Sequence, residues 1–290
     1  MQNEEQKIRR EREDVEGFRN WLTERECAKH TIQKYVTDVH TFFRFLGKES
    51  QVDKGRMLEY REWLLLHYAG ASVNSMLAAL NQFLEYLGQD RLKLKRLRIQ
   101  KKLYQEETKY LSRKEYFRLV DTARRKGREQ LALIMETIGS TGIRISELSY
   151  FTADGVRAGK IHVWNKGKYR VVLLPEHLRK RLKAFMKKEG RASGPVFCTR
   201  NGEPKDRSNI WREMKELSRE AGVEPEKVFP HNLRHLFARI FYRVTGNLTN
   251  LAGILGHSSL EATRVYTADG LEQLMRDIGR VQILGKKITT

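Results

Sequence analysis

The chain has 290 residues, of which 40% are hydrophobic, enough to build two domain cores and too many for an intrinsically disordered protein. Its formal net charge of +20, from 56 Lys and Arg against 36 Asp and Glu, favours a polyanionic partner. We expect nucleic acid rather than a membrane surface, because no segment approaches the roughly 20 apolar residues that span a bilayer.

The N-terminal sequence and the two cysteines indicate the cytoplasm. Residues 1–18 carry charges of both signs without an apolar stretch, so they form neither a secretory signal nor a transit peptide. Cys27 and Cys198 lack paired spacing, which suits a reducing compartment. We therefore expect a cytoplasmic, nucleoid-associated protein and assign the cysteines no role.

Residues 1–90 have the periodicity of a small all-helical domain. Apolar residues recur at helical spacing in four stretches, 18–22, 32–46, 57–67 and 73–87. Thr31 and Ser72 are the predicted N-caps of the second and fourth helices, and Gly47 and Gly88 are their predicted stops. Most aromatic residues of this region are expected to lie in its core rather than to stack on bases.

A strongly basic segment follows and predicts a linker over residues 91–108. The stretch 91–103 contains no acidic residue. A solvated connector is the plainer interpretation, but in a chain this basic the segment could equally lie along DNA phosphates. The cations concerned are Arg91, Lys93, Lys95, Arg96, Arg98, Lys101 and Lys102.

Residues 109–290 are expected to form a second domain, mainly α-helical with a small β-sheet. Ser112 and Glu115 form a capping box that opens its first helix. In the stretch KIHVWNKGKYRVVLLP, residues 160–175, β-branched residues flank a glycine turn, which predicts a hairpin. The residues at the predicted tip are Lys166, Gly167 and Lys168.

Three short segments of this second domain could carry chemistry, and the first is TGIRISEL, residues 141–148. Arg144 and Glu147 are three residues apart after a glycine turn, so they share a face of a short helix. Taken alone, this pair is more often a surface ion pair than a functional site.

The second segment is PHNLRH, residues 230–235. His231 and Arg234 are also three residues apart, on a helix expected to begin near Pro230, so both point toward one place. His231 and His235 have the spacing of zinc ligands, but the glutamate of the HExxH motif is missing and an arginine would crowd the metal. We therefore predict no metal here.

The third segment, LGHSSLEATRVYT, covers residues 255–267. It places His257 nine residues before Tyr266. A tyrosine near a C-terminus is usually a packing or surface residue. This one is a candidate for a chemical role only because the other two segments are present in the same chain.

Together the three segments resemble the tyrosine recombinases, also called the phage integrase family. The resemblance lies in TGxRxxEL, HxLRH and an LGH followed nine residues on by Tyr, in that order. It covers the chain from about residue 110 to its end, and the helical N-terminal region looks like the core-binding domain of the family. By this resemblance, the catalytic residues are Arg144, Lys166, His231, Arg234, His257 and the nucleophile Tyr266. Glu147 is expected to hold the catalytic side chains in place without being one of them.

The hairpin departs from the family pattern. Many relatives have Lys-Gly-x-Lys-x-Arg, whereas this chain has the shorter Lys-Gly-Lys-Tyr-Arg over residues 166–170. Lys166 is the expected catalytic lysine because it precedes the glycine, and Lys168 is the alternative.

The resemblance implies an enzyme that cleaves and rejoins DNA through a 3′-phosphotyrosine, without metal, ATP or other cofactor. Two domains would close around duplex DNA as a clamp. The expected partners are double-stranded DNA with a specific recombination site, three further copies of the chain in a synaptic tetramer, and an accessory protein of unknown identity. The chain length favours a short Xer-like or inversion-type enzyme, and residues 271–278 are expected to form a helix that docks on a neighbouring subunit.

Two other functions fit parts of the pattern. A type IB topoisomerase would share the tyrosine and the cationic clamp but would relax a plasmid that has no recombination site. A catalytically silent DNA-binding protein would share the charge and bind with a steep salt dependence, but it would form no covalent adduct.

Overall fold

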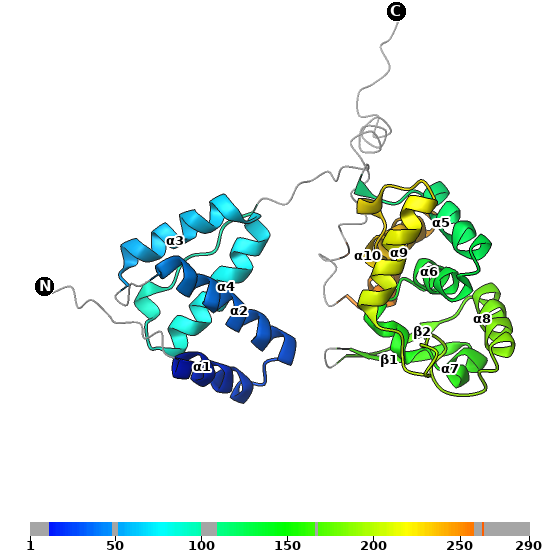
Figure 1. Ribbon diagram of the computed structural model, residues 1–290, viewed down its shortest axis with the longest axis horizontal. Helices are drawn as coiled ribbons and strands as arrows, with labels where there is room; N and C mark the ends of the chain where they lie inside the picture. The colour runs from blue at the N-terminus through cyan, green and yellow to red at the C-terminus, as the bar shows by residue number, and fades with distance from the viewer. Residues whose placement is uncertain (1–11, 48–51, 100–108, 166–167, 258–262, 264–290) are drawn as a thin grey trace, which may run out of the picture. The chain divides into compact units, whose positions relative to one another are not determined.

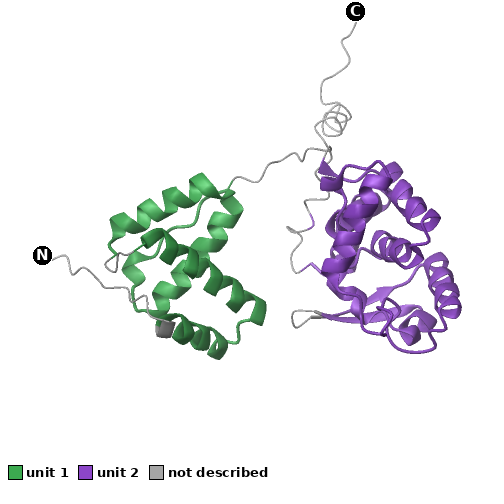
Figure 2. Ribbon diagram, viewed as in Figure 1, with its two compact units in different colours: residues 1–101 green, residues 102–290 purple. Residues whose placement is uncertain are grey.

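The computed structural model describes residues 12–47, 52–99, 109–165, 168–257 and 263. The chain divides into two compact units, residues 1–101 and 102–290, coloured separately in Figure 2. Each unit has its own hydrophobic core.

The described part of the first unit is helical, as the periodicity predicts (Figure 1). Its elements are α1 (Arg12–Glu24), α2 (Lys29–Leu46), α3 (Lys54–His67), α4 (Gly70–Tyr86) and the 3₁₀ turn η1 (Asp90–Leu92). The predicted stops hold, because Gly47 caps α2 with φ 60° and Gly88 follows the end of α4 with φ 69°.

The predicted N-caps of α2 and α4 are wrong. The backbone N–H of Thr31 donates to Ala28 O, and that of Ser72 to Ala69 O, both at 2.8 Å, so each hydroxyl residue lies inside the first turn. Ala28 and Ala69 are the caps, and neither makes a side-chain capping bond. These helices begin without the hydroxyl cap that sequence alone favours, because packing of their apolar faces stabilises them.

Aromatic side chains form much of the first core, as predicted. The rings of Phe18 and Phe83 meet edge to face at a centroid distance of 5.2 Å, and Phe42 meets Tyr60 in the same way at 4.9 Å. All four side chains are at most 1% exposed, so they are unavailable for stacking on bases.

The beginning of the basic segment is attached to the first unit. Leu94 exchanges two hydrogen bonds with the Asn81 side chain, at 2.8 and 2.9 Å, and Leu97 exchanges two with Asn74, at 3.0 and 2.7 Å. Asn74 and Asn81 are two turns apart on α4, so they hold the segment in an extended form along the helix. Residues 91–99 therefore belong structurally to the first unit.

The described part of the second unit consists of helices and one hairpin, which lies at the edge of the unit (Figure 1). Its α-helices are α5 (Arg113–Arg125), α6 (Glu129–Thr141), α7 (Ala153–Ala158), α8 (Glu176–Lys188), α9 (Arg207–Glu220), α10 (Pro230–Thr245) and α11 (Leu248–Leu255). The described part of this unit also contains the 3₁₀ segments η3 (Ile145–Tyr150) and η4 (Pro225–Lys227) and the strands β1 (Lys160–Asn165) and β2 (Lys168–Leu173). The predicted Ser112 and Glu115 capping box is present with both of its bonds. No described helix is both long enough and apolar enough to cross a bilayer.

The hairpin is an antiparallel pair that runs from Lys160 opposite Leu173 to Asn165 opposite Lys168. Lys168 is thus the first paired residue of β2 rather than part of the connection. Side chains alternate between the two faces of a strand. Val163 and Val172 are at most 3% exposed on one face, whereas Trp164 is 60% exposed on the other.

Candidate active site

Arg144 is positioned by the end of α6. The helix ends at Gly142 in the left-handed conformation, φ 66°, and a Cβ atom there would lie 2.4 Å from the Phe237 ring, so only glycine fits. Arg144 then precedes η3, and its backbone N–H donates to Glu147 Oε2 at 2.8 Å while its guanidinium donates to Oε1 at 3.2 Å. The two side chains meet as their three-residue spacing predicts.

Arg234 is the buried centre of the site. It lies on α10, which begins at Pro230 as predicted, and only 1% of the residue is exposed. Its Nη1 donates to Gly142 O at 2.6 Å and its Nη2 to Leu255 O at 2.7 Å. One guanidinium therefore joins α10 to the end of α6 and to the end of α11, which are the three motif segments found in the sequence.

The C-terminal end of α11 is surrounded by three arginines. Three successive carbonyls, of Ile254, Leu255 and Gly256, accept from Arg170 at 2.5 Å, Arg234 at 2.7 Å and Arg144 at 3.4 Å respectively. The last carbonyls of a helix have no partners within the helix and carry the negative end of its dipole. They therefore hold three cations from three other elements in one place.

His257 follows these carbonyls directly. Its Nε2 accepts from Arg234 Nη2 at 3.1 Å, so the ring proton lies on Nδ1, which faces Thr263 Oγ1 at 2.9 Å. Burial, together with the charges of Arg234 and Arg144, lowers the pKa of His257 to about 4. The imidazole is therefore neutral at pH 7 and has a defined tautomer.

His231 and His235 lie one turn apart on α10. Their rings meet edge to face with centroids 4.5 Å apart. Burial and the charges of Arg234 and Arg144 lower the pKa of His231, whose residue is nevertheless exposed. Burial and the neighbouring His231 lower the pKa of His235 to about 4. Among the described residues, no three His, Cys, Asp or Glu side chains gather as metal ligands.

Glu147 is the counter-ion of the cluster. Its side chain is fully buried and contacts Arg144 and, through Oε2 at 2.6 Å, Arg170. Burial raises the pKa of this carboxyl, but the Arg144 backbone N–H and the charges of Arg170 and Arg144 outweigh it and leave the pKa below its ordinary value. The carboxylate is ionised and fixes both guanidiniums.

Two residues of this arrangement were missed by the sequence analysis. Arg170 was noticed only as the end of the hairpin motif, and Thr263 was given no role. The signal for Arg170 was its place in the family pattern of the hairpin, whereas a hydroxyl residue three positions before a tyrosine carries no signal of its own.

Several predicted residues lie outside the described part of the chain. They include the proposed nucleophile Tyr266, the hairpin residue Lys166, and Lys101 and Lys102 of the basic segment. The backbone of Lys168 is described as the start of β2, but its side chain is not.

The described cations of the basic segment lie on the first unit. Arg91, Lys95, Arg96 and Arg98 are exposed. Lys93 is half-buried and pairs with Glu85 at 2.9 Å and with Asp90 at 2.5 Å. The exposed members can meet an anionic partner, whereas Lys93 is already neutralised by two carboxylates.

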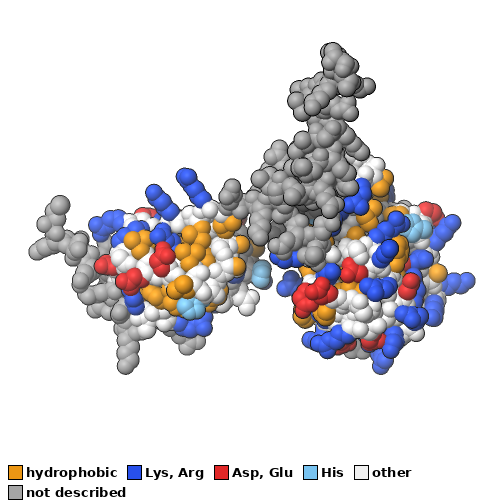
Figure 3. Space-filling view, turned by 90° about the horizontal axis from the view of Figure 1, so that it is seen from above, with side chains coloured by type: hydrophobic (Ala, Val, Ile, Leu, Met, Phe, Trp, Pro, Cys, Tyr) orange, Lys and Arg blue, Asp and Glu red, His pale blue; other side chains and the backbone are white. Residues whose placement is uncertain are grey.

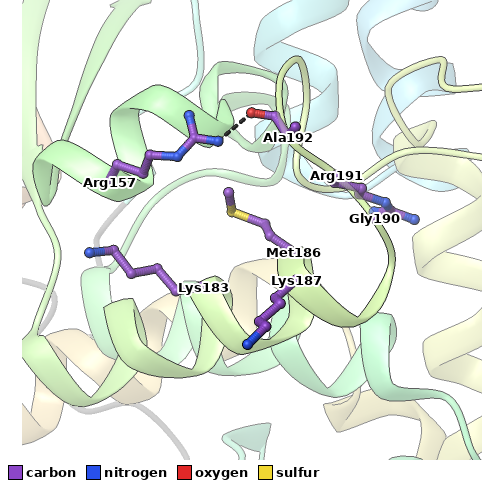
Figure 4. A pocket seen from close by; sticks show the side chains of 7 residues that line it. All are labelled: Arg157, Lys183, Met186, Lys187, Gly190, Arg191 and Ala192. Atoms are coloured by element: carbon purple, nitrogen blue, oxygen red, sulfur yellow. Dashed lines mark hydrogen bonds between the residues drawn. The ribbon is translucent and has the colours of Figure 1, made fainter.

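Basic side chains also cover the second unit away from the cluster. Figure 3 shows Lys and Arg spread over the visible face of that unit. A hollow of 540 Å³ beside α8 is lined by Arg157, Lys183, Lys187 and Arg191 among others. In Figure 4, Lys183 and Lys187 point in different directions, and Arg157 donates to the Ala192 carbonyl. Because these cations do not converge, the hollow is not a preformed anion site.

The fold and the site together describe a basic two-domain protein. Its first unit is helical, and its second is mainly helical with one described hairpin and a cluster of arginines at a helix end. Within this class of protein the chain can be assigned to a family. A family model described as "Phage integrase family" matches residues 109–272, and one described as "Phage integrase, N-terminal SAM-like domain" matches residues 15–90. The chain therefore belongs to the phage integrase family, the tyrosine recombinases, which are enzymes that cleave and rejoin DNA.

The relatives include Xer recombinases. Tyrosine recombinase XerD of Vibrio cholerae serotype O1 is 27% identical over 271 residues, which cover 87% of this chain and 89% of the relative. Tyrosine recombinase XerA of Thermococcus kodakarensis is 26% identical over 287 residues, covering 94% and 97%. The chain thus resembles the Xer-like members of its family.

Solved structures share the fold. XerH recombinase bound to its difH substrate, in a pre-cleavage complex, matches with a TM-score of 0.68 at 20% identity, over 97% of this chain and 91% of that chain. A lambda integrase dimer bound to a COC′ core site matches with a TM-score of 0.70 at 16% identity, over 95% and 79%. The expected fold class, mainly helical with a small sheet, is confirmed.

Proposed function

We propose that the protein is a site-specific recombinase that cuts and rejoins duplex DNA through a covalent bond to Tyr266. The Tyr266 phenol oxygen attacks the scissile phosphorus and its proton passes to His231. The bond from phosphorus to the 5′ oxygen breaks, and that oxygen takes a proton from Lys166. The products are a 3′-phosphotyrosine and a 5′-hydroxyl, and because one ester replaces another, the reverse step joins a strand without ATP.

The observation that carries the proposal is the gathering of three motif segments at the end of α11. Arg144 and Arg234 reach adjacent carbonyls there, and His257 continues the same segment. A scissile phosphate at this place would meet two guanidiniums, which are always charged and match phosphate oxygens in pairs. An arginine directed at a phosphoryl transition state contributes about 10³–10⁵-fold in rate.

The histidines fit two different tasks. His231 is exposed, and its lowered pKa keeps it unprotonated at pH 7, as a proton acceptor for Tyr266 must be. His257 Nε2 accepts from Arg234 in the described geometry, so it must gain a proton before it can donate to a phosphate. The negative charge of bound DNA would offset the neighbouring arginines and raise the pKa of His257.

The remaining contacts with DNA come from the basic surfaces. The exposed cations of residues 91–99, together with Lys101, Lys102 and Lys168, would neutralise backbone phosphates and give binding a steep salt dependence. By analogy with the relatives, we propose a tetramer at the paired recombination sites, held by residues 271–278 of each subunit on a neighbour. The reaction would take place in the cytoplasm, on the nucleoid.

The test is a trapped covalent adduct. Purified protein is incubated with a duplex that carries a candidate recombination site, chosen by searching the DNA that flanks the gene for inverted repeats. A nick in the duplex is placed so that the cleaved strand cannot be rejoined. We expect a protein–DNA band that survives denaturation with wild type and with Tyr242→Phe, a control tyrosine that packs partly buried on α10. Tyr266→Phe should give no band, and equal adduct from wild type and Tyr266→Phe would refute the assignment of the nucleophile.

A further inference from the structure

Arg170 connects the hairpin to the arginine cluster. It lies on β2 opposite Val163, two residues beyond Lys168, where strand pairing begins at the tip. Its Nη2 donates to Glu147 Oε2 at 2.6 Å and its Nη1 to Ile254 O at 2.5 Å. The side chain is 15% exposed, against 38% for Arg144, and its two terminal nitrogens donate to a carboxylate and a carbonyl, so Arg170 is held at both ends within the second unit.

Gly256 provides the space for this side chain. A Cβ atom at Gly256 would lie 2.8 Å from Arg170 Cδ and 2.9 Å from its Nε, and Gly256 has φ 64°. Any other residue would therefore both strain the backbone and displace Arg170. The glycine that precedes His257 thus lets the hairpin arginine reach the end of α11.

Glu147 couples Arg170 to Arg144. One carboxylate receives the Arg144 guanidinium on Oε1 and the Arg170 guanidinium on Oε2. Because the carboxylate is fully buried, it has little room to adapt if either partner moves. The position of the hairpin and the position of Arg144 are therefore fixed by one group.

We propose that Arg170 is a positioning residue that sets how the hairpin presents its tip lysine to the 5′ oxygen leaving the scissile phosphate. This inference rests on the function proposed above. A planar guanidinium reaches a carboxylate and a carbonyl at the same time, whereas a lysine ammonium in its place has no second arm. Without the two contacts the hairpin would shift, and a displacement of about 1 Å at a reacting group can cost about 100-fold in rate.

The experiment compares two leaving groups. Adduct formation is measured in single turnover on the nicked duplex with the ordinary 5′ oxygen at the scissile bond and on the same duplex with sulfur at that atom. A thiol has a pKa of about 8.5, so sulfur leaves without needing a proton, and a defect in proton delivery disappears on that substrate. Lys166→Ala and Lys168→Ala identify the lysine whose loss is restored by sulfur.

We expect Arg170→Gln to reduce cleavage about 100-fold with oxygen and less than about tenfold with sulfur. Arg170→Lys keeps the charge and one contact, so it should give a smaller defect in cleavage that sulfur restores in the same way. It replaces Arg170→Gln in the test if the glutamine variant fails to fold. Arg179→Gln is the matched control, because Arg179 also joins a carboxylate, Glu176, to a carbonyl, that of Arg157, on the same unit. It should cleave both substrates like wild type.

An equal defect of the Arg170 variants on both substrates would overturn the inference, because it would mean general damage to the site or a direct contact with phosphate. Failure of the proposed function and failure of the positioning role give different results. If wild type forms no adduct on either substrate, the proposed function fails. If wild type and the lysine variants behave as described but the Arg170 variants are not restored by sulfur, only the positioning role fails.

Discussion

The two units bury different kinds of side chain. Among the described residues of the first unit, the one buried polar side chain is that of Thr41, and the rest of the core is aliphatic and aromatic. The second unit buries Thr122, Glu136, Thr137, Thr141, Glu147, Ser218, Asn232, Arg234 and Thr263. A buried charge is costly unless it is paired and hydrogen-bonded. In the second unit, Arg234 donates to the carbonyls of Gly142 and Leu255, whereas the buried carboxylates of Glu136 and Glu147 are paired with arginines.

The difference indicates which unit does chemistry. A core of packed rings, such as that around Phe83, needs only volume and shape, so similar residues can replace one another. The core around Arg234 depends on the direction of each donor and acceptor. Conservative substitutions should therefore be mild in the first unit and severe in the second.

Arg234→Lys should produce the largest effect. Lysine cannot reach both Gly142 O and Leu255 O, so we expect cleavage to fall by at least about 10³-fold. The second unit should also melt at a lower temperature, because a charge is left buried with acceptors unpaired. Single-turnover adduct formation and calorimetry measure the two effects.

Arg144→Lys is the matched comparison for this first prediction. The Arg144 side chain is 38% exposed, so this variant should lose as much cleavage rate as Arg234→Lys while its melting temperature changes little. Wild-type cleavage by Arg234→Lys would show that the buried guanidinium is structural packing only.

Glu147→Gln should be the next most severe change. The substitution keeps the size of the side chain but leaves Arg144 and Arg170 without their counter-ion. Removing one partner of a buried ion pair costs about 3–5 kcal/mol in stability. Calorimetry of the second unit should show that loss, with Glu216→Gln, whose side chain is 55% exposed in a 3.9 Å pair, as the control that does not.

Much of this site could be predicted because it is encoded by local spacing. Arg144 and Glu147 meet because they are three residues apart, and Ser112 caps a helix because Glu115 follows at the right distance. Thr31 does not cap α2 in spite of its favourable position before an apolar stretch, because packing of the α2 face sets the start of the helix at Ala28. Local rules therefore located the motifs better than they located helix ends.

The contacts that assemble the site could not be predicted in this way. Arg170 reaches the carbonyl of Ile254, a residue 84 positions away, and Arg234 reaches those of Gly142 and Leu255. Every residue has a backbone carbonyl, so the sequence gives no sign of which ones will accept from a distant arginine. Only the fold shows that the end of α11 is where they meet.

A moderate effect is expected for Asn81→Ala in the first unit. Each of its two bonds to Leu94 contributes about 1 kcal/mol, so the unit should lose about 2 kcal/mol and the basic segment should detach from α4. If the exposed cations bind phosphates together, the affinity for duplex DNA should fall. The slope of the logarithm of that affinity against the logarithm of the salt concentration should also become smaller. Asn209→Ala, which removes an amide oxygen that accepts from Arg212 on the surface of α9, should leave both quantities unchanged. An unchanged salt slope in Asn81→Ala would remove the basic segment from the DNA interface.

The smallest expected effect is the sensitivity of the second unit to mild acid. Burial lowers the pKa of both His235 and His257 to about 4 in the folded protein, whereas an unfolded histidine has a pKa of about 6.5. Between these values the unfolded chain binds more protons, so stability is complete above about pH 6.5 and is lost as pH falls toward 4. Calorimetry at pH 7.5 and 5.5 should show the decline, and His235→Gln should decline less. An identical decline in both proteins would mean that His235 is already solvated in the fold, so that the polar core of the second unit would extend less far along α10 than the geometry indicates.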